Sequence, residues 1–151
     1  MVLIAAAGPV SNLLVALVAG LPIRFGLVPF YHPFISPALA GLAGSIGDRH
    51  VRHRGTIGGS LANSDPAASY PSAVLAMNAT IHTDKRTIKA DDFFQGMFTT
   101  ALEPGELVVR LKFPLPKAAA YCKFPHPASG YAMAGVFIAQ TASGVRVAVT
   151  G

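Results

Sequence analysis

Residues 55–66, with the sequence GTIGGSLANSDP, constrain the local structure of this chain more than any other segment. Their first six positions hold three glycines and two hydroxyl side chains, directly before a proline-led segment with helical character. Glycine can adopt positive φ and leaves space for another molecule to approach the backbone. Successive N–H groups followed by a helix N-terminus form an anion site. The pattern predicts a loop that holds a phosphate or pyrophosphate; a tight turn between two elements is the alternative.

The surrounding sequence matches a longer motif. Residues 46–68 read IGDRHVRHRGTIGGSLANSDPAA, and similar agreement continues at DDFFQGMFTTAL (residues 91–102), PGELV (104–108) and YCKF (121–124). These segments closely resemble the flavoprotein (medium) subunit of molybdenum hydroxylases, the group that includes aerobic carbon monoxide dehydrogenases and xanthine dehydrogenases. The agreement keeps the family's order over about residues 36–136. The chain is identified as a member of this family, truncated at both ends.

The resemblance implies FAD as the cofactor. The positions that match cofactor-binding positions of the family are Thr56, Ile57, Gly58, Gly59, Ser60, Asn63, Asp65, Val108 and Lys123. By their own chemistry, Asp65 is a good helix N-cap, Val108 suits a core strand and Lys123 suits an exposed strand. Two positions depart from the family pattern, because Ser69 stands where an acid is common and His53 replaces an asparagine.

The same resemblance implies a role in electron transfer. Electrons would arrive from a molybdopterin-binding large subunit through an iron–sulfur small subunit, and would leave through FAD to an acceptor. The protein would supply binding and electronic tuning, and no catalytic residue of its own is expected. The expected location is cytoplasmic, with membrane association open. The alternatives are a non-enzymatic fragment that keeps the fold without binding FAD, and a small membrane-anchored protein.

The start of the chain is strongly apolar. Residues 1–23 carry no charge, and Arg24 is the first charged residue. As a helix they would be about 35 Å long, enough to cross a bilayer, although Pro9 and Asn12 oppose a simple membrane span. Nothing in residues 1–31 resembles the first glycine-rich loop of the family. A membrane helix, a foreign leader fused to the domain and a buried apolar hairpin all remain open.

Composition excludes several other classes of function. Lysine and arginine total 12 against 7 acidic residues, a net charge of +5, and no basic block interleaved with aromatic residues is present. We therefore expect no nucleic-acid partner. A single cysteine excludes an internal disulfide and an iron–sulfur cluster built by this chain alone. The five histidines lack metal-binding spacing, so no metal site is expected.

Local patterns predict an α+β fold, made of the second subdomain of a two-part FAD-binding domain plus the start of an α+β C-terminal domain. We expect a leader over residues 1–31, the FAD-binding subdomain over 32–116 and the incomplete C-terminal domain over 117–151. Helices are expected over residues 37–46, about 66–77 with an interruption at Pro71, and a turn at 91–94. Strands are expected over residues 79–83, 87–89, 107–113, from 118, 131–141 and 145–150. Residues 47–63 are expected to form a loop.

Overall fold

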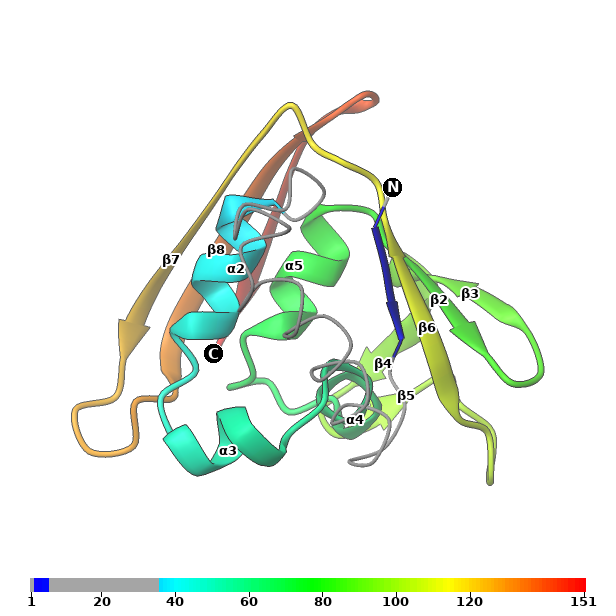
Figure 1. Ribbon diagram of the computed structural model, residues 1–151, viewed down its shortest axis with the longest axis horizontal. Coiled ribbons are helices and arrows are strands. Elements are labelled where there is room, and N and C mark those ends of the chain that lie inside the picture. The colour runs from blue at the N-terminus through cyan, green and yellow to red at the C-terminus, as the bar shows by residue number, and fades with distance from the viewer. Residues whose placement is uncertain (1, 6–35) are drawn as a thin grey trace, which may run out of the picture.

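The computed structural model describes residues 2–5 and 36–151, which form an α+β fold (Figure 1). The helices are α2 (Pro37–Gly44), α3 (Arg49–Arg54), α4 (Ile57–Asn63), α5 (Tyr70–Ala76) and α6 (Ala90–Phe93). The strands are β1 (Val2–Ala5), β2 (Thr80–Thr83), β3 (Thr87–Lys89), β4 (Phe94–Gly96), β5 (Thr99–Thr100), β6 (Val108–Phe113), β7 (Ala118–Pro125), β8 (Ala132–Thr141) and β9 (Gly144–Thr150).

The first sheet is built around β6. Its strand order is β1-β6-β2-β3, and every neighbouring pair is antiparallel. Leu111 and Phe113 of β6 are buried, while Lys112 between them is partly exposed, as the alternation in the sequence predicts. In the β2–β3 hairpin, Ile81 pairs with Ile88 and both enter the core. A short β4–β5 ribbon follows α6.

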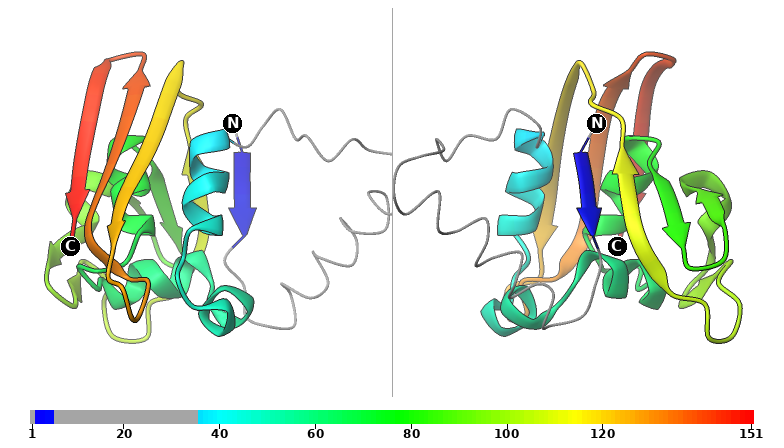
Figure 2. Two further views of the ribbon diagram at one scale, coloured as in Figure 1. Left: turned by 90° about the vertical axis from the view of Figure 1, so that its left-hand side faces the viewer. Right: turned by 45° about the vertical axis from the view of Figure 1, so that its right-hand side comes forward.

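The second sheet, β7-β8-β9, covers the other side of the helices (Figure 2). Strand β8 is central, and its Phe137 and Ala139 are fully buried. Helix α5 packs against β8 and β9, and α2 packs against β7. The helices α2 and α5 therefore lie between two antiparallel sheets, and one hydrophobic cluster extends through all three layers.

Most elements expected from the sequence are present at nearly their expected bounds. The main shift concerns α5, which begins at Tyr70 and not near residue 66. The Asp65 carboxylate accepts the Ala67 N–H at 2.9 Å, so it closes a separate turn and does not cap α5. Pro71 then occupies the first turn of the helix, where its missing N–H costs nothing.

The apolar start of the chain is only partly described. Residues 2–5 form β1, with Val2 opposite Phe113 and Ala5 opposite Arg110 in β6. A helix that begins at residue 1, one of the alternatives left open by the sequence, does not describe these four residues, which form a strand. The rest of the expected leader, residues 6–31, lies outside the described residues. Over residues 2–5 and 36–151, the structure contains no helix with both the length and the apolar character needed to span a bilayer.

Candidate cofactor site

The glycine-rich segment folds differently from the expected loop. Residues 47–63 contain two short helices, each started by a polar side chain. The Asp48 carboxylate accepts the His50 N–H at 2.6 Å before α3, and Thr56 Oγ1 accepts the Gly59 N–H at 2.9 Å before α4. Both are ordinary N-caps, which satisfy amide groups that have no partner within a helix. The prediction of a loop over these residues is wrong because the capping signals outweigh the glycines.

Two of the three glycines of the motif lie where α4 begins. Gly58 and Gly59 are in the first turn of α4, and Gly58 is buried. A Cβ atom on Gly59 would lie 3.0 Å from Thr56 Oγ1, within the capping bond itself. Glycine at position 59 therefore leaves room for the Thr56 cap.

A pocket of about 280 Å³ lies beside the start of α4. It is enclosed by the end of α2, the inner side of α3, the turn before α5 and the β7–β8 connection. Its lining residues are Ala43, Ile46, Gly47, Val51, Arg52, Gly55, Thr56, Ser60, Ala67, Ala68, Ser69, Tyr70, Lys123, Gly130 and Tyr131. Two cations and no carboxylate belong to this set, so the described lining favours a ligand that carries negative charge.

Three of the expected binding residues meet at this pocket. Thr56 and Ser60 come from the glycine-rich motif, and Lys123 comes from β7 in the second sheet. The Lys123 ammonium donates to the Gly130 carbonyl at 3.0 Å and also to the Ser45 carbonyl. Burial lowers the pKa of Lys123. The lysine therefore joins the end of α2 to the β7–β8 connection at the edge of the pocket.

The other expected residues lie elsewhere. Ile57 and Val108 pack against the hydrophobic core. Asn63 is exposed at the end of α4, and the Asp65 carboxylate holds the turn described above. None of these four residues belongs to the pocket lining, and neither do Gly58 and Gly59.

Sequence reasoning did not assign the opposite wall of the pocket. A Cβ atom on Gly47 would lie 2.6 Å from backbone atoms of Gly130, whose φ is +70°. Only glycine permits this backbone crossing, because Gly130 has a left-handed conformation and neither position has room for a side chain. Tyr70 and Tyr131 add aromatic rings, and burial raises the pKa of Tyr70. Gly47 belongs to the motif and could have indicated a position of close backbone contact. Nothing in the sequence indicates that its contact is Gly130.

Comparisons with known proteins agree with the motif and the fold. The model of the family described as FAD binding domain in molybdopterin dehydrogenase matches residues 31–116. The chain is 36% identical over 139 residues to the glyceraldehyde dehydrogenase medium chain of Sulfolobus acidocaldarius. The aligned segment covers 83% of this chain and 50% of that protein. It is 34% identical over 126 residues to the carbon monoxide dehydrogenase medium chain of Hydrogenophaga pseudoflava, covering 76% of this chain and 44% of that protein.

Solved structures give the same result. Carbon monoxide dehydrogenase from Hydrogenophaga pseudoflava superimposes with a TM-score of 0.68 at 35% identity, over 76% of this chain and 44% of that chain. Quinoline 2-oxidoreductase from Pseudomonas putida 86 superimposes with a TM-score of 0.67 at 29% identity, again over 76% of this chain and 44% of that chain. The chain spans about half the length of the curated relatives it matches.

Proposed function

The chain belongs to the family of FAD binding domains in molybdopterin dehydrogenases, and from that premise we propose that its pocket beside α4 binds part of FAD. One observation carries the proposal. Thr56, Ser60 and Lys123 match cofactor-binding positions of the family from two segments far apart in the sequence, and the fold brings all three to one pocket.

The chemistry of the pocket supports this ligand. The Arg52 guanidinium suits a phosphate group, because it presents N–H donors to an anion. Tyr70 and Tyr131 provide aromatic surface suited to a flat ring system. Ser69 lines the pocket where the family pattern often has an acid that touches the cofactor, and a serine cannot supply that charge. A volume of about 280 Å³ lies near the lower limit for ligand pockets, which suits one part of a dinucleotide.

The residues of the chain would bind and orient the cofactor. Thr56 Oγ1 already accepts the Gly59 N–H, so its own O–H remains available to donate to a ligand. Lys123 gives two of its three N–H donors to the Ser45 and Gly130 carbonyls, and the third remains for a ligand oxygen. When bound, FAD supplies the redox chemistry, and the protein contributes position and electrostatics.

The names of the relatives support a role within an assembly. They include medium chains of carbon monoxide dehydrogenase and a subunit alpha of the 6-hydroxypseudooxynicotine dehydrogenase complex. We propose that this chain likewise works beside a molybdopterin-binding large subunit and an iron–sulfur small subunit, passing electrons through FAD to an acceptor. In this proposal residues 32–116 are the second half of the FAD-binding domain, and residues 117–151 begin the C-terminal domain.

Titration of the purified chain with FAD, followed by flavin fluorescence, tests the proposal. We expect saturable binding that Ser60→Ala weakens about fivefold, because one hydroxyl that lines the pocket is lost. Thr56 is left unchanged, because its Oγ1 caps α4. Asn63→Ala is the matched control, since Asn63 lies in the same helix but outside the pocket lining. Absence of binding in a folded chain would favour the non-enzymatic fragment. Equal weakening by the control would place FAD elsewhere.

A further inference from the structure

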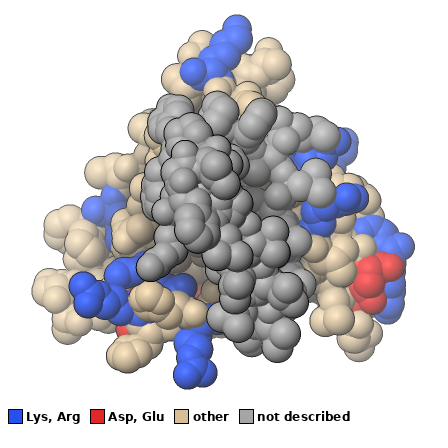
Figure 3. Space-filling model, in the orientation of Figure 1, with Lys and Arg blue, Asp and Glu red and all other residues tan. Residues whose placement is uncertain are grey.

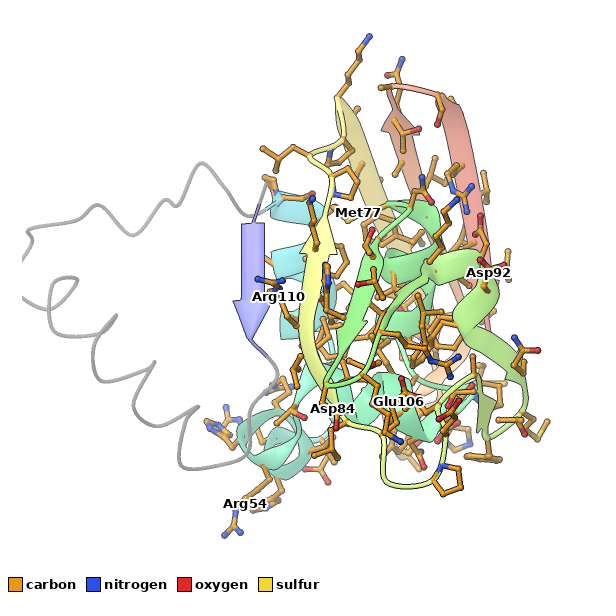
Figure 4. All side chains as sticks on the ribbon, turned by 90° about the vertical axis from the view of Figure 1, so that its right-hand side faces the viewer. Arg54, Met77, Asp84, Asp92, Glu106 and Arg110 are labelled. Carbon is orange, nitrogen blue, oxygen red and sulfur yellow. The ribbon has the colours of Figure 1, made fainter. Side chains whose placement is uncertain are left out.

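Helix α3 has two distinct faces. Its sequence is RHVRHR, and all six side chains are exposed. Val51 and Arg52 line the cofactor pocket. At about 100° per residue, the other four residues fall on the opposite side of the helix, within an arc of about 140°. These four residues, Arg49, His50, His53 and Arg54, are called the basic face. Figure 4 shows Arg54 projecting away from the body of the fold.

The basic face lacks neutralising charge among the described residues. The ion pairs found in residues 36–151 involve Lys85, Arg86 and Arg146, and none of them includes an arginine of α3. The adjacent acid, Asp48, already accepts the His50 N–H as the helix cap. Five of the seven acidic residues of the chain instead lie within residues 84–106. Figure 3 shows basic side chains at the lower left as well as at the right and the top, while most of the visible acidic surface lies at the right edge.

The sequence of α3 gives this helix little support. Arg49 lies in the first turn, at the positive end of the helix dipole, where a cation is unfavourable. A six-residue helix with no buried residue gains little from packing. An anionic surface against the basic face would offset the charges of Arg49 and Arg54 without any change in the fold.

We propose that the basic face of α3 docks an acidic surface of another protein. Arginine binds carboxylates through two parallel N–H bonds, and histidine adds further ring N–H donors. Single-stranded nucleic acid is a poorer match, because residues 45–54 contain no phenylalanine, tyrosine or tryptophan on which bases could stack. The basic face points away from the cofactor pocket, so the proposal stands whether or not FAD binds.

The test uses the full chain and a fluorescein-labelled peptide of twelve alternating aspartate and glutamate residues. Fluorescence anisotropy at 50 mM salt is compared for the wild type, the variant Arg49→Gln/Arg54→Gln and the variant Lys89→Gln/Lys117→Gln. The last variant is the matched control, because it removes the same charge from two exposed lysines outside α3. We expect the α3 substitutions to weaken binding at least about fivefold and the control to change it less than about twofold.

Raising the salt concentration to 300 mM should weaken wild-type binding and reduce the difference between the variants. Three results would overturn the proposal: no binding of the peptide, equal weakening by the two variants, or tighter α3-dependent binding of a twelve-nucleotide RNA than of the peptide. The second result would indicate a general effect of net charge, and the third a nucleic-acid site. Circular dichroism of each variant confirms that the chain is folded.

Discussion

Arg86 and the arginines of α3 are all cations at the surface of the same chain, but they have different surroundings. Arg86 donates from Nε and Nη2 to the Glu106 carboxylate at 3.0 and 3.1 Å. Glu106 is buried, and Figure 4 shows it within the loops at the base of the first sheet. The arginines of α3 have no carboxylate partner among the described residues. Arg86 therefore stabilises the fold through an ion pair, whereas the arginines of α3 are exposed and available to another molecule.

Glu106 is the centre of the structural set. Besides Arg86, it accepts the Thr83 hydroxyl at 2.7 Å and the Glu103 N–H at 2.8 Å. These bonds join the β2–β3 hairpin to the turn that leads into β6. Burial of a carboxylate is tolerated only when such partners are present. The bonds that Glu106 accepts from Arg86, Thr83 and Glu103 therefore stabilise the first sheet.

The largest expected effect follows from removing this carboxylate. Glu106→Ala removes the carboxylate that accepts from the Arg86 guanidinium, the Thr83 hydroxyl and the Glu103 amide, and leaves Arg86 and Thr83 only their hydrogen bonds to the Ala101 and Arg86 carbonyls. We expect the midpoint of thermal unfolding to fall by roughly 10 °C, measured by circular dichroism. Glu103→Ala is the control, because the Glu103 side chain is 59% exposed and its removal should shift the midpoint only slightly. Equal shifts for the two variants would contradict the distinction drawn above.

The same carboxylate predicts a dependence of stability on pH. Hydrogen bonds from Arg86, the Glu103 amide and Thr83 lower the pKa of Glu106 from 4.5 to about 2. A pKa that is lower in the folded state stabilises the fold above the unfolded value, and this contribution is lost as the pH falls from 4.5 to about 2. Urea unfolding across this range should show the loss in the wild type and much less of it in Glu106→Gln. Parallel pH profiles would show that other groups dominate.

The wall of the cofactor pocket depends on close backbone contact between Gly47 and Gly130. Gly130→Ala places a methyl group 2.8 Å from the Gly47 Cα and forces a residue with a side chain into φ +70°. Gly105→Ala meets a similar φ of +75° with nothing within 4 Å, so it measures the backbone cost alone. We expect the free energy of unfolding to fall by about 2 kcal/mol for Gly130→Ala and about 1 kcal/mol for Gly105→Ala. Only the first should also weaken FAD binding.

The smallest effect on stability is expected on the basic face. Arg49→Gln/Arg54→Gln removes two charges that have no ion-pair partner among the described residues. The free energy of unfolding in urea should change by less than about 0.5 kcal/mol, with any change toward greater stability. A clear loss of stability would mean that these arginines support the fold, and the contrast with Arg86 would no longer hold.

Most strands of the two larger sheets are predictable because their signals are local, whereas β1, β4 and β5 were not expected from the sequence. Alternation across Leu111, Lys112 and Phe113 marks β6, and the turn at residues 142–144 marks the β8–β9 hairpin. The helices α3 and α4 were missed because the run of basic residues and the paired glycines both oppose helix formation. Asp48 and Thr56 were the available signals, since each stands where an N-cap is required.

The site was predictable only in part. The motif places Thr56 and Ser60 together because they are close in sequence, and the family resemblance adds Lys123. The crossing of Gly47 and Gly130 depends on how β7 and β8 lie against α2, which no local pattern records. The two faces of α3 become visible only once Val51 and Arg52 are known to line the pocket.

Chemical-shift mapping determines whether FAD binds in the pocket beside α4. Amide spectra of the ¹⁵N-labelled chain are recorded during a titration with FAD. We expect shifts concentrated at Thr56, Ser60, Tyr70, Lys123 and Tyr131, with little change in the β2–β3 hairpin. Shifts centred elsewhere, or a well-dispersed spectrum that FAD leaves unchanged, would contradict binding in this pocket.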